Sequence, residues 1–237
     1  MQPLAFIRND PDETFGIAPR VYDAEHVPWR VVDALGGEHL PELGEVSGVV
    51  MFGGSMNVDQ VREFPFLDRV RNLTRRAVDA RVPFLGICLG GQLLARAFDY
   101  GVAKAPAREI GFEPLESTHA AAADPLTASY ATGDMVFHWH EDMVELPAGA
   151  ELLATSSTTP VQAYRIGDRA WGFQFHLEID RPEIDLWIEG FGPDTLATEW
   201  GKSPERIRAE ADRHLVGHER KGAEVFRAFA RIAAQEG

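Results

Sequence analysis

Apolar and polar residues alternate over the first hundred positions in blocks that predict strands and helices in turn. Residues 4–7 form a short apolar run, residues 27–35 give a second candidate strand, and residues 46–52 are mostly apolar. A strand that is apolar on both faces is typical of a sheet covered by helices on both sides. Residues 66–80 place apolar side chains at helical spacing, with arginine and aspartate between them. Residues 46–98 therefore predict strand, helix, strand and helix, an order that favours parallel pairing through right-handed crossovers.

The pattern changes after Gly101. Short runs of strand composition are separated there by turn residues, and they predict a mixed or antiparallel section of sheet. The runs are residues 102–114, 134–144, 151–155, 161–166 and 170–175.

The last quarter of the chain has helical periodicity, over residues 182–189 and again over residues 204–235. Glycine is a poor helix former, so we expect the glycines of this region to divide it into two or three helices. They stand at positions 190, 192, 201, 217 and 222. We see no repeat and no low-complexity linker in the sequence. We therefore expect one α/β domain over residues 1–190, with residues 191–237 forming a helical C-terminal extension packed on the same domain.

The charge and cysteine content of the chain indicate which kinds of binding partner and compartment to expect. Acidic residues number 37 and basic residues 23, for a formal net charge of −14. This negative field argues against nucleic acid or an anionic membrane surface as the main partner. A single cysteine excludes an internal disulfide and fits a reducing compartment. The N-terminal apolar stretch is short, and no run reaches the ~18 residues of a membrane span, so we expect a soluble cytoplasmic protein.

The single cysteine lies where a strand is predicted to pass into a helix. It is the centre of Gly86-Ile87-Cys88-Leu89-Gly90, and the apolar run before it ends at Gly86. This spacing is typical of a nucleophile elbow, in which glycines on both sides leave room for neighbouring backbone. A helix N-terminus favours a thiolate, and the N–H of Leu89 would point toward an oxyanion. The alternative interpretation is a buried cysteine that only packs in the core.

A second polar group ends the run Trp171-Gly172-Phe173-Gln174-Phe175-His176-Leu177-Glu178. Its bulky apolar residues predict a strand, and residues two apart on a strand point to the same side. His176 and Glu178 can therefore meet at the carboxyl end of that strand, in extended geometry or through a turn. A thiol nucleophile requires a base, and the base requires a group that holds its tautomer. Cys88, His176 and Glu178 supply these three parts, although separately they would be a core cysteine, a structural histidine and a surface charge.

The order of these features is more specific than any one of them. Gly53-Gly54 follows one predicted strand, Gly86-x-Cys88-x-Gly90-x-Gln92 surrounds the end of the next, and His176-x-Glu178 follows a late one. This arrangement, over roughly residues 44–180, resembles the class I (triad-type) glutamine amidotransferases, and in particular the glutaminase domain of GMP synthase. The resemblance implies a flavodoxin-like three-layer α/β fold with a mostly parallel open sheet.

The resemblance also implies roles for individual residues. Cys88 would be the nucleophile, His176 the base and Glu178 the carboxylate that orients the base. The backbone N–H groups of Gly54 and Leu89 would form the oxyanion hole.

The substrate-binding residues implied by the resemblance are Gln92, Trp139 and His140. Gln92 falls where the family has a residue that helps to hold the glutamyl part of the substrate. Residues 138–142 align with a segment whose backbone binds the α-carboxylate and amine of glutamine. That segment commonly reads Ser-His-Gly-Asp and here reads Trp-His-Glu-Asp, which predicts a bulkier pocket. The common His-Pro-Glu has Leu177 in place of proline, which should loosen the turn without removing a catalytic atom.

His138 and His140 also suggest a metal site, because residues i and i+2 of a strand share a face. Catalytic zinc requires about three protein ligands, and the sequence offers no third ligand at a convincing spacing. We therefore expect no metal and no cofactor.

By resemblance, the implied activity is hydrolysis of the glutamine side-chain amide through a γ-glutamyl thioester on Cys88. Only residues 179–237 follow the triad, too few and too helical for a nucleotide-using synthetase. Three interpretations stay open. The chain could be a glutaminase that delivers ammonia to a separate synthetase subunit, or a self-sufficient hydrolase of γ-glutamyl peptides or amines, or a non-enzymatic binding protein on the same fold. The acidic surface and the C-terminal helices would carry a partner or form a homo-oligomer.

Overall fold

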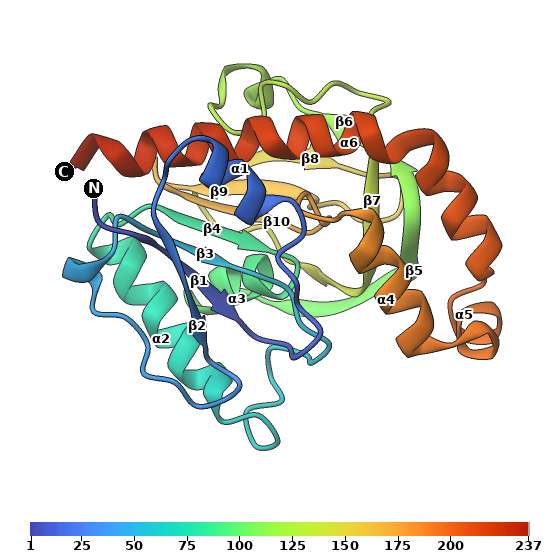
Figure 1. The fold of residues 1–237 in the computed structure, drawn as a ribbon, viewed down its shortest axis with the longest axis horizontal. Helices are drawn as coiled ribbons and strands as arrows, with labels where there is room; N and C mark the ends of the chain where they lie inside the picture. Colours follow the sequence, from blue (N-terminus) through green and yellow to red (C-terminus); the bar gives the residue numbers. More distant parts are fainter. Residues whose placement is uncertain (237) are drawn as a thin grey trace.

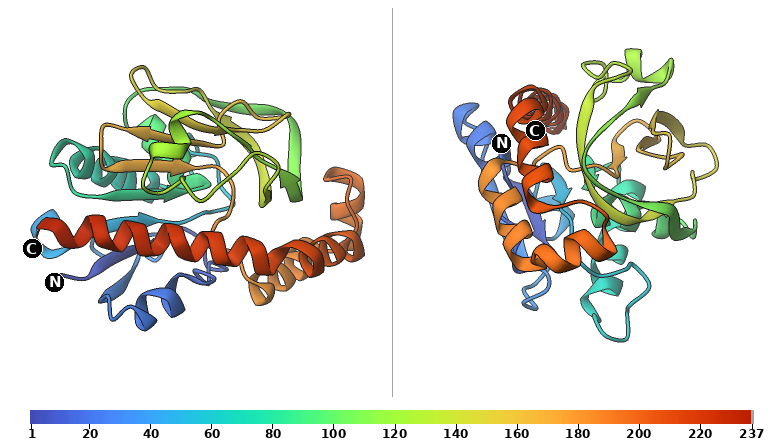
Figure 2. Two further views of the ribbon diagram at one scale, coloured as in Figure 1. Left: turned by 90° about the horizontal axis from the view of Figure 1, so that it is seen from above. Right: turned by 90° about the vertical axis from the view of Figure 1, so that its right-hand side faces the viewer.

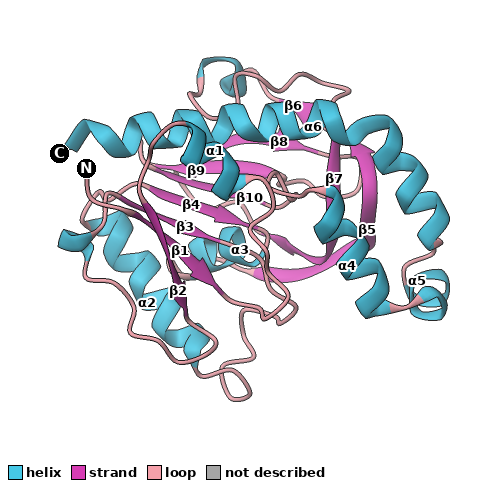
Figure 3. Cartoon of the chain, viewed as in Figure 1, coloured by secondary structure: helices cyan, strands magenta, loops and turns pink. Residues whose placement is uncertain are grey.

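The computed structural model describes residues 1–236, which form an α/β structure around an eight-stranded sheet (Figures 1 and 3). Its strand order is β2-β1-β3-β4-β10-β9-β8-β6. The parallel half consists of β1 (Leu4–Arg8), β2 (Trp29–Asp33), β3 (Gly48–Met51), β4 (Phe84–Ile87) and β10 (Ala170–Phe173). The order 2-1-3-4 followed by a fifth parallel strand is that of a flavodoxin-like doubly wound sheet. The predicted fold class is confirmed.

Antiparallel strands extend this sheet beyond β10. They are β9 (Ala163–Ile166), β8 (Glu151–Thr155) and β6 (Glu116–Ser117). A separate antiparallel pair, β5 (Val102–Pro114) with β7 (Met135–Val144), stands beside the end of the main sheet (Figure 1). The mixed section predicted after Gly101 is therefore confirmed.

Helices cover both faces of the main sheet (Figure 2). On one face lie α1 (Ala18–Ala24) and α6 (Pro204–Ala233), and on the other lie α2 (Phe66–Asp79) and α3 (Leu89–Arg96). The alternation of side chains along β1 shows how one strand serves both layers. Leu4 and Phe6 belong to the cluster under α1 and α6, whereas Ala5 and Ile7 belong to the cluster under α2 and α3.

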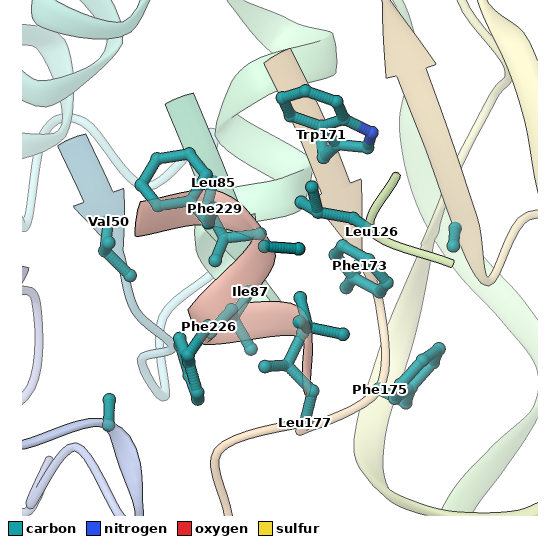
Figure 4. Close-up of a cluster of buried hydrophobic side chains, with 14 of the residues drawn as sticks. Val50, Leu85, Ile87, Leu126, Trp171, Phe173, Phe175, Leu177, Phe226 and Phe229 are labelled. Atoms are coloured by element: carbon teal, nitrogen blue, oxygen red, sulfur yellow. The ribbon is translucent and has the colours of Figure 1, made fainter. Parts of the chain in front are cut away.

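The cluster under α6 ties the C-terminal helix to the sheet. Figure 4 shows Phe226 and Phe229 of α6 next to Leu85 and Ile87 of β4, and all four side chains are fully buried. Leu177, from the segment that carries the predicted base, belongs to the same cluster. The position of that segment is therefore coupled to the packing of α6.

As far as the structure describes the C-terminal region, it contains three α-helices, within the predicted two or three, and a final 3-10 turn, η3 (Ala234–Glu236). Not all of its glycines separate the helices. α4 (Arg181–Phe191) and α5 (Pro193–Glu199) are divided at Gly192, and Gly201 lies in the turn before α6. Gly190 lies inside α4, and Gly217 and Gly222 lie inside α6, so the expectation that these three glycines break a helix is wrong. A helix interior tolerates glycine at a cost of about 1 kcal/mol each, and the apolar face buried along α6 outweighs that cost.

The N-terminal part of α6 packs with α4 and α5 against β5 and β7, around Phe112, Phe137 and Trp139. The boundary predicted between residues 190 and 191 falls in the last turn of α4, and the division into domain and extension stays a prediction. Within the described residues, no helix is both long and apolar enough to cross a membrane.

Candidate active site

Cys88 stands on the tight turn between β4 and α3. Its φ is +50°, a left-handed conformation that is uncommon for a residue with a side chain. A Cβ on Gly86 would lie 2.4 Å from Gly90 O, and a Cβ on Gly90 would lie 2.0 Å from Met51 O. Because neighbouring backbone excludes side chains at both positions, this turn has the geometry expected of a nucleophile elbow. The thiol is consequently held at the N-terminus of α3.

His176 and Glu178 lie beside Cys88, in the segment that follows β10. Glu178 Oε1 is 2.7 Å from His176 Nδ1, a hydrogen-bonding distance. A Cβ on Gly53 would lie 3.2 Å from the His176 ring and 3.7 Å from Cys88 Cβ, so the ring and the thiol border the same small space. The chain bends after Phe173, and the two side chains therefore meet through a turn instead of through strand alternation. The structure brings together the three residues predicted as a triad.

The surroundings of His176 favour its protonated form. Burial lowers the pKa of the imidazole, but the charges of Glu178 and Cys88 outweigh burial and hold that pKa well above its ordinary value. The residue is only 3% exposed, so water screens these charges little. Since Nδ1 bonds to Glu178, Nε2 is the nitrogen left for the thiol and for a substrate.

The backbone of residues 176–178 is anchored on several sides. His176 N–H donates to Phe137 O at 2.9 Å, and Ile17 N–H donates to Glu178 O at 2.8 Å. His218 of α6 bonds through Nε2 to His176 O at 2.8 Å. Leu177 replaces the proline common in the family, and its side chain is fully buried. We expected the leucine to loosen this turn, but hydrogen bonds and burial hold the backbone in place.

Two buried glutamines form a hydrogen-bonded chain that ends at the Cys88 thiol. Gln174 Nε2 donates to Cys88 Sγ at 3.7 Å, and Gln92 Nε2 donates to Gln174 Oε1 at 3.2 Å. Gln92 also lines a cavity next to Cys88, where we predicted a substrate contact. The pair holds the thiol from the side of α3.

The predicted oxyanion donors flank the thiol. Leu89 is the first residue of α3, and the first N–H groups of a helix have no partner inside the helix. Gly54 follows β3 and lines both cavities that meet at Cys88. Both residues border the thiol, and their role as oxyanion donors stays a prediction.

The loop that carries Gly54 is held by two carboxylates. Asp10 Oδ2 accepts hydrogen bonds from the backbone N–H and the hydroxyl of Ser55, at 3.0 and 2.7 Å. Asp142 Oδ2 accepts one from Asn57 Nδ2 at 2.8 Å. These bonds fix the part of the loop that follows the glycine.

Two cavities meet at Cys88, with volumes of about 410 and 230 Å³. Gly54, Ser55, Cys88, Trp139 and Phe191 line both. Trp139, a predicted substrate contact, therefore stands between them. We call the larger one the charged cavity and the smaller one the aromatic cavity, after the side chains that line each.

The charged cavity has basic and acidic side chains on one wall. Lys104 and Arg108 come from β5, whereas Glu141 and Asp142 come from β7. Lys104 Nζ lies 3.1 Å from Asp142 Oδ1 and also pairs with Glu141, and Arg108 Nε lies 2.9 Å from Glu141 Oε2. Such a wall offers both signs of charge to a zwitterionic ligand.

The aromatic cavity lies on the side of His176. Trp187 packs edge-on against the His176 ring, with 4.8 Å between ring centroids. Trp139 and Phe191 pack beside it in a tilted arrangement with centroids 5.0 Å apart, and Leu186 completes the apolar lining. This cavity contains the predicted base but none of the basic residues of the charged cavity.

His140 belongs to a buried network more than to the cavity surface. Its Nδ1 lies 3.0 Å from Asp142 O and its Nε2 lies 3.1 Å from Glu109 Oε2. Ser156 and Gln162 donate to the two oxygens of Glu109, at 2.7 and 2.8 Å. Burial raises the pKa of Glu109, but the hydrogen bond to His140 and the charges of nearby histidines lower it to about 2. The network makes His140 a residue that holds the cavity wall.

Glu109, His138 and His140 are residues that could hold a metal ion, since their ligand atoms lie within 4.8 Å of one another. The expectation that no third ligand lies near the two histidines is therefore wrong. Pairing of β5 with β7 places Glu109 opposite His140, although they are far apart in sequence. His138 is fully buried, neither of its ring nitrogens has a hydrogen-bond partner, and burial lowers its pKa to about 3. Both oxygens of Glu109, however, already accept hydrogen bonds from side chains.

Two further buried carboxyl groups surround Glu178. Burial and then the charge of Glu178 raise the pKa of Glu183 to about 7. Burial, followed by the charges of Glu183 and Glu178, raises the pKa of Glu13 well above its ordinary value. Protons on Glu13 and Glu183 reduce the repulsion around the carboxylate that faces His176.

Sequence reasoning missed several of these residues. Gln174 had a usable signal, because it stands two positions before His176 in an alternating run. Glu109, Trp187 and Phe191 had none, since their places depend on how β5 and α4 pack around the elbow.

The fold and the site define the class of this protein. An elbow cysteine, with a histidine–glutamate pair after the last parallel strand, stands at the carboxyl edge of a flavodoxin-like sheet, where such folds bind ligands. The family model described as glutamine amidotransferase class-I matches residues 21–185. The chain belongs to this family.

Individual proteins are similar to this chain over more residues than the family model matches. The chain is 33% identical over 205 residues to the glutamine amidotransferase-like protein YfeJ of Salmonella typhimurium, covering 85% of this chain and 84% of that protein. It is 29% identical over 168 residues to one of the subunits of the glutamine-hydrolysing GMP synthase of Thermoplasma acidophilum, covering 67% and 80%. The solved structure of a glutamine amidotransferase from Methylobacillus flagellatus superposes with a TM-score of 0.89 at 28% identity, over 100% of this chain and 97% of that one.

Proposed function

We propose that this protein hydrolyses the side-chain amide of glutamine, or of a larger γ-glutamyl amide, through a γ-glutamyl thioester on Cys88. The observation that carries the proposal is the hydrogen-bonded pair of His176 and Glu178 beside a cysteine on a strained elbow. Family membership supports the same chemistry.

The reaction follows from the positions of the groups. His176 Nε2 holds the proton that the Cys88 thiol gives up, and the thiolate sulfur attacks the amide carbon to form a C–S bond. The N–H groups of Gly54 and Leu89 stabilise the oxyanion. His176 then gives its proton to the leaving nitrogen as the C–N bond breaks, and ammonia or an amine departs.

Water completes the cycle. The same imidazole, now neutral, takes a proton from a water molecule that attacks the thioester carbon. The C–S bond breaks, glutamate is released and the thiol is restored. Glu178 holds the ring through Nδ1 in both steps and stabilises its charged form.

The charged cavity is the place proposed for the glutamyl part. Arg108 and Lys104 would face its α-carboxylate, and Glu141 and Asp142 would face its α-ammonium group. Gln92 lines the same cavity next to the thiol.

Two settings for this activity stay open as alternatives. The likeness to one of the subunits of a GMP synthase supports transfer of ammonia to a separate synthetase subunit. The aromatic cavity beside His176 supports a self-sufficient hydrolase, because ammonia alone does not require a cavity of about 230 Å³. A binding protein without activity is the least supported, since Cys88, His176 and Glu178 lie together as the chemistry would require.

Release of glutamate from L-glutamine by the purified chain tests the chemistry. We expect Cys88→Ala to abolish release, because no other group can form the thioester. Glu178→Gln should lower kcat by a smaller factor, on the order of 10²–10⁴, because it removes only the orienting charge. Glu189→Gln, an exposed change on α4, serves as the control.

Wild-type turnover by Cys88→Ala would refute the mechanism. If the wild-type chain is silent on glutamine, labelling of Cys88 by a glutamine-like electrophile, followed by intact mass, shows whether the thiol and the glutamyl site are functional without a partner.

A further inference from the structure

We propose that the preferred substrates are γ-glutamyl amides of apolar amines, with the amine seated in the aromatic cavity beside His176. The inference rests on the proposed function and names its substrate class. It rests on how the two cavities divide the groups around Cys88.

An amide at Cys88 has three substituents to place. Its oxygen belongs near the backbone of Gly54 and Leu89, and its nitrogen belongs next to the acid that protonates it. His176 lines the aromatic cavity and is absent from the lining of the charged cavity. The leaving amine therefore extends into the aromatic cavity, and the glutamyl chain extends into the charged one.

The aromatic cavity suits an apolar body larger than ammonia. Its lining includes Trp139, Trp187 and Phe191, and its volume of about 230 Å³ far exceeds the space of one water-sized leaving group. Leu186 and Phe191 are each 39% exposed, so apolar surface on α4 faces solvent unless a ligand covers it. Burial of an apolar amine on these rings stabilises the complex through the same area-dependent effect that drives core packing.

Charge at the rim sets a second requirement. Asp10, Asp12 and Glu13 line the aromatic cavity, and no arginine or lysine does. Since burial favours a proton on Glu13, Asp10 and Asp12 supply the negative charge. Asp12 is exposed at this rim. A leaving group with its own carboxylate, as in a γ-glutamyl dipeptide, would meet like charge there, whereas a neutral or cationic amine would not. The cavity therefore selects γ-glutamyl amines over γ-glutamyl peptides.

Three compounds test separately whether the leaving amine must be apolar and whether it must lack a carboxylate. γ-L-Glutamylphenethylamide and γ-L-glutamyl-L-phenylalanine differ by one carboxylate, and L-glutamine lacks the apolar body altogether. We expect kcat/KM for the phenethylamide to exceed the value for each of the other two by at least tenfold, with Cys88→Ala as the blank. A smaller ratio in either comparison overturns the inference.

Two pairs of variants test the assigned contacts. Leu186→Ala should lower kcat/KM for the phenethylamide at least fivefold more than Leu146→Ala, a change at a leucine of similar exposure (37%) outside both cavities.

The second pair tests the charge at the rim. Asp12→Lys should raise the dipeptide-to-phenethylamide ratio of kcat/KM at least fivefold. Glu151→Lys makes the same change of charge at an exposed position of β8 and should leave that ratio unchanged. Equal effects within either pair contradict the assignment.

Failure of this inference is distinguishable from failure of the proposed function. If glutamine is the best substrate and Cys88 is required, the substrate class is wrong and the thioester chemistry stands. If none of the three compounds is hydrolysed, the inference is overturned. Labelling of Cys88 by a glutamine-like electrophile then decides separately whether the proposed chemistry survives.

Discussion

At the scale of the residue, the site is a set of ionisable groups that control one another. Glu178 faces His176 at 2.7 Å, and its charge raises the pKa of the imidazole and also that of the neighbouring carboxyl groups. The pKa of His176 rises because its charged form is stabilised, and the pKa of Glu183 rises because its charged form is buried and repelled. One carboxylate thus keeps a proton on the base and favours a proton on its carboxyl neighbour.

The raised pKa of Glu183 predicts a loss of stability as the solution becomes alkaline. Because the folded-state pKa of about 7 lies above the ordinary 4.5, the stabilisation is fully present below pH 4.5 and is lost as the pH rises through about 7. We expect Glu183→Gln to remove a decline on the order of 3 kcal/mol from the free energy of unfolding between pH 5 and pH 8.5. Urea unfolding at a series of pH values measures it.

The control for this change is Glu189→Gln, at an exposed position of the same helix. Some decline should persist in Glu183→Gln, because the pKa of Glu13 is raised as well. Identical pH profiles for wild type and Glu183→Gln would contradict the assigned protonation.

At the scale of the element, Gly222 allows α6 to lie directly against the segment that carries His176 and Glu178. The helical conformation alone would not require glycine at that position. A Cβ on Gly222 would lie 2.0 Å from Leu177 O, so the helix touches the backbone between the predicted base and its carboxylate. His218, one turn earlier, bonds to His176 O. The helix therefore supports the site through backbone contact as well as through its apolar face.

Two glycines of α6 should respond oppositely to the same substitution. Gly217 is exposed, and no atom lies within 4 Å of the place that a methyl group would take there, so Gly217→Ala should stabilise the protein by roughly 0.5–1 kcal/mol through helix propensity. Gly222→Ala should destabilise it by roughly 1–3 kcal/mol, because helix or segment must shift. Thermal unfolding measures both, and kcat should fall only for Gly222→Ala. A stabilised Gly222→Ala would show that the contact with Leu177 is absent in solution.

At the scale of the whole molecule, the sheet carries the site and the C-terminal helix completes the core beneath it. α6 crosses from the β5–β7 pair to the opposite end of the sheet, where both termini lie (Figures 1 and 2). Its residues Val225, Phe226 and Phe229 are fully buried. Without them, one face of the sheet would be exposed to water.

Removal of residues 204–237 should therefore abolish folding of the remainder. Each buried phenylalanine is worth about 3–5 kcal/mol when truncated, and a domain of this kind has only about 5–15 kcal/mol of stability. We expect the shortened chain to show no cooperative thermal transition by circular dichroism, whereas the full chain unfolds in one. A shortened chain that unfolds cooperatively would instead establish residues 204–237 as a separable part of the predicted extension.

The sequence alone determined the parallel strand–helix units over residues 46–98, the elbow at Cys88 and the pairing of His176 with Glu178. These features depend on periodicity, glycine spacing and strand ends, which are properties of a few consecutive residues. Only the tertiary structure decided that Glu109 faces His140, that Trp187 and Phe191 form a cavity beside the base, and that Gly222 lies within a continuous helix. Those contacts join residues far apart in the chain, and long-range packing, for which local sequence carries no signal, brings them together.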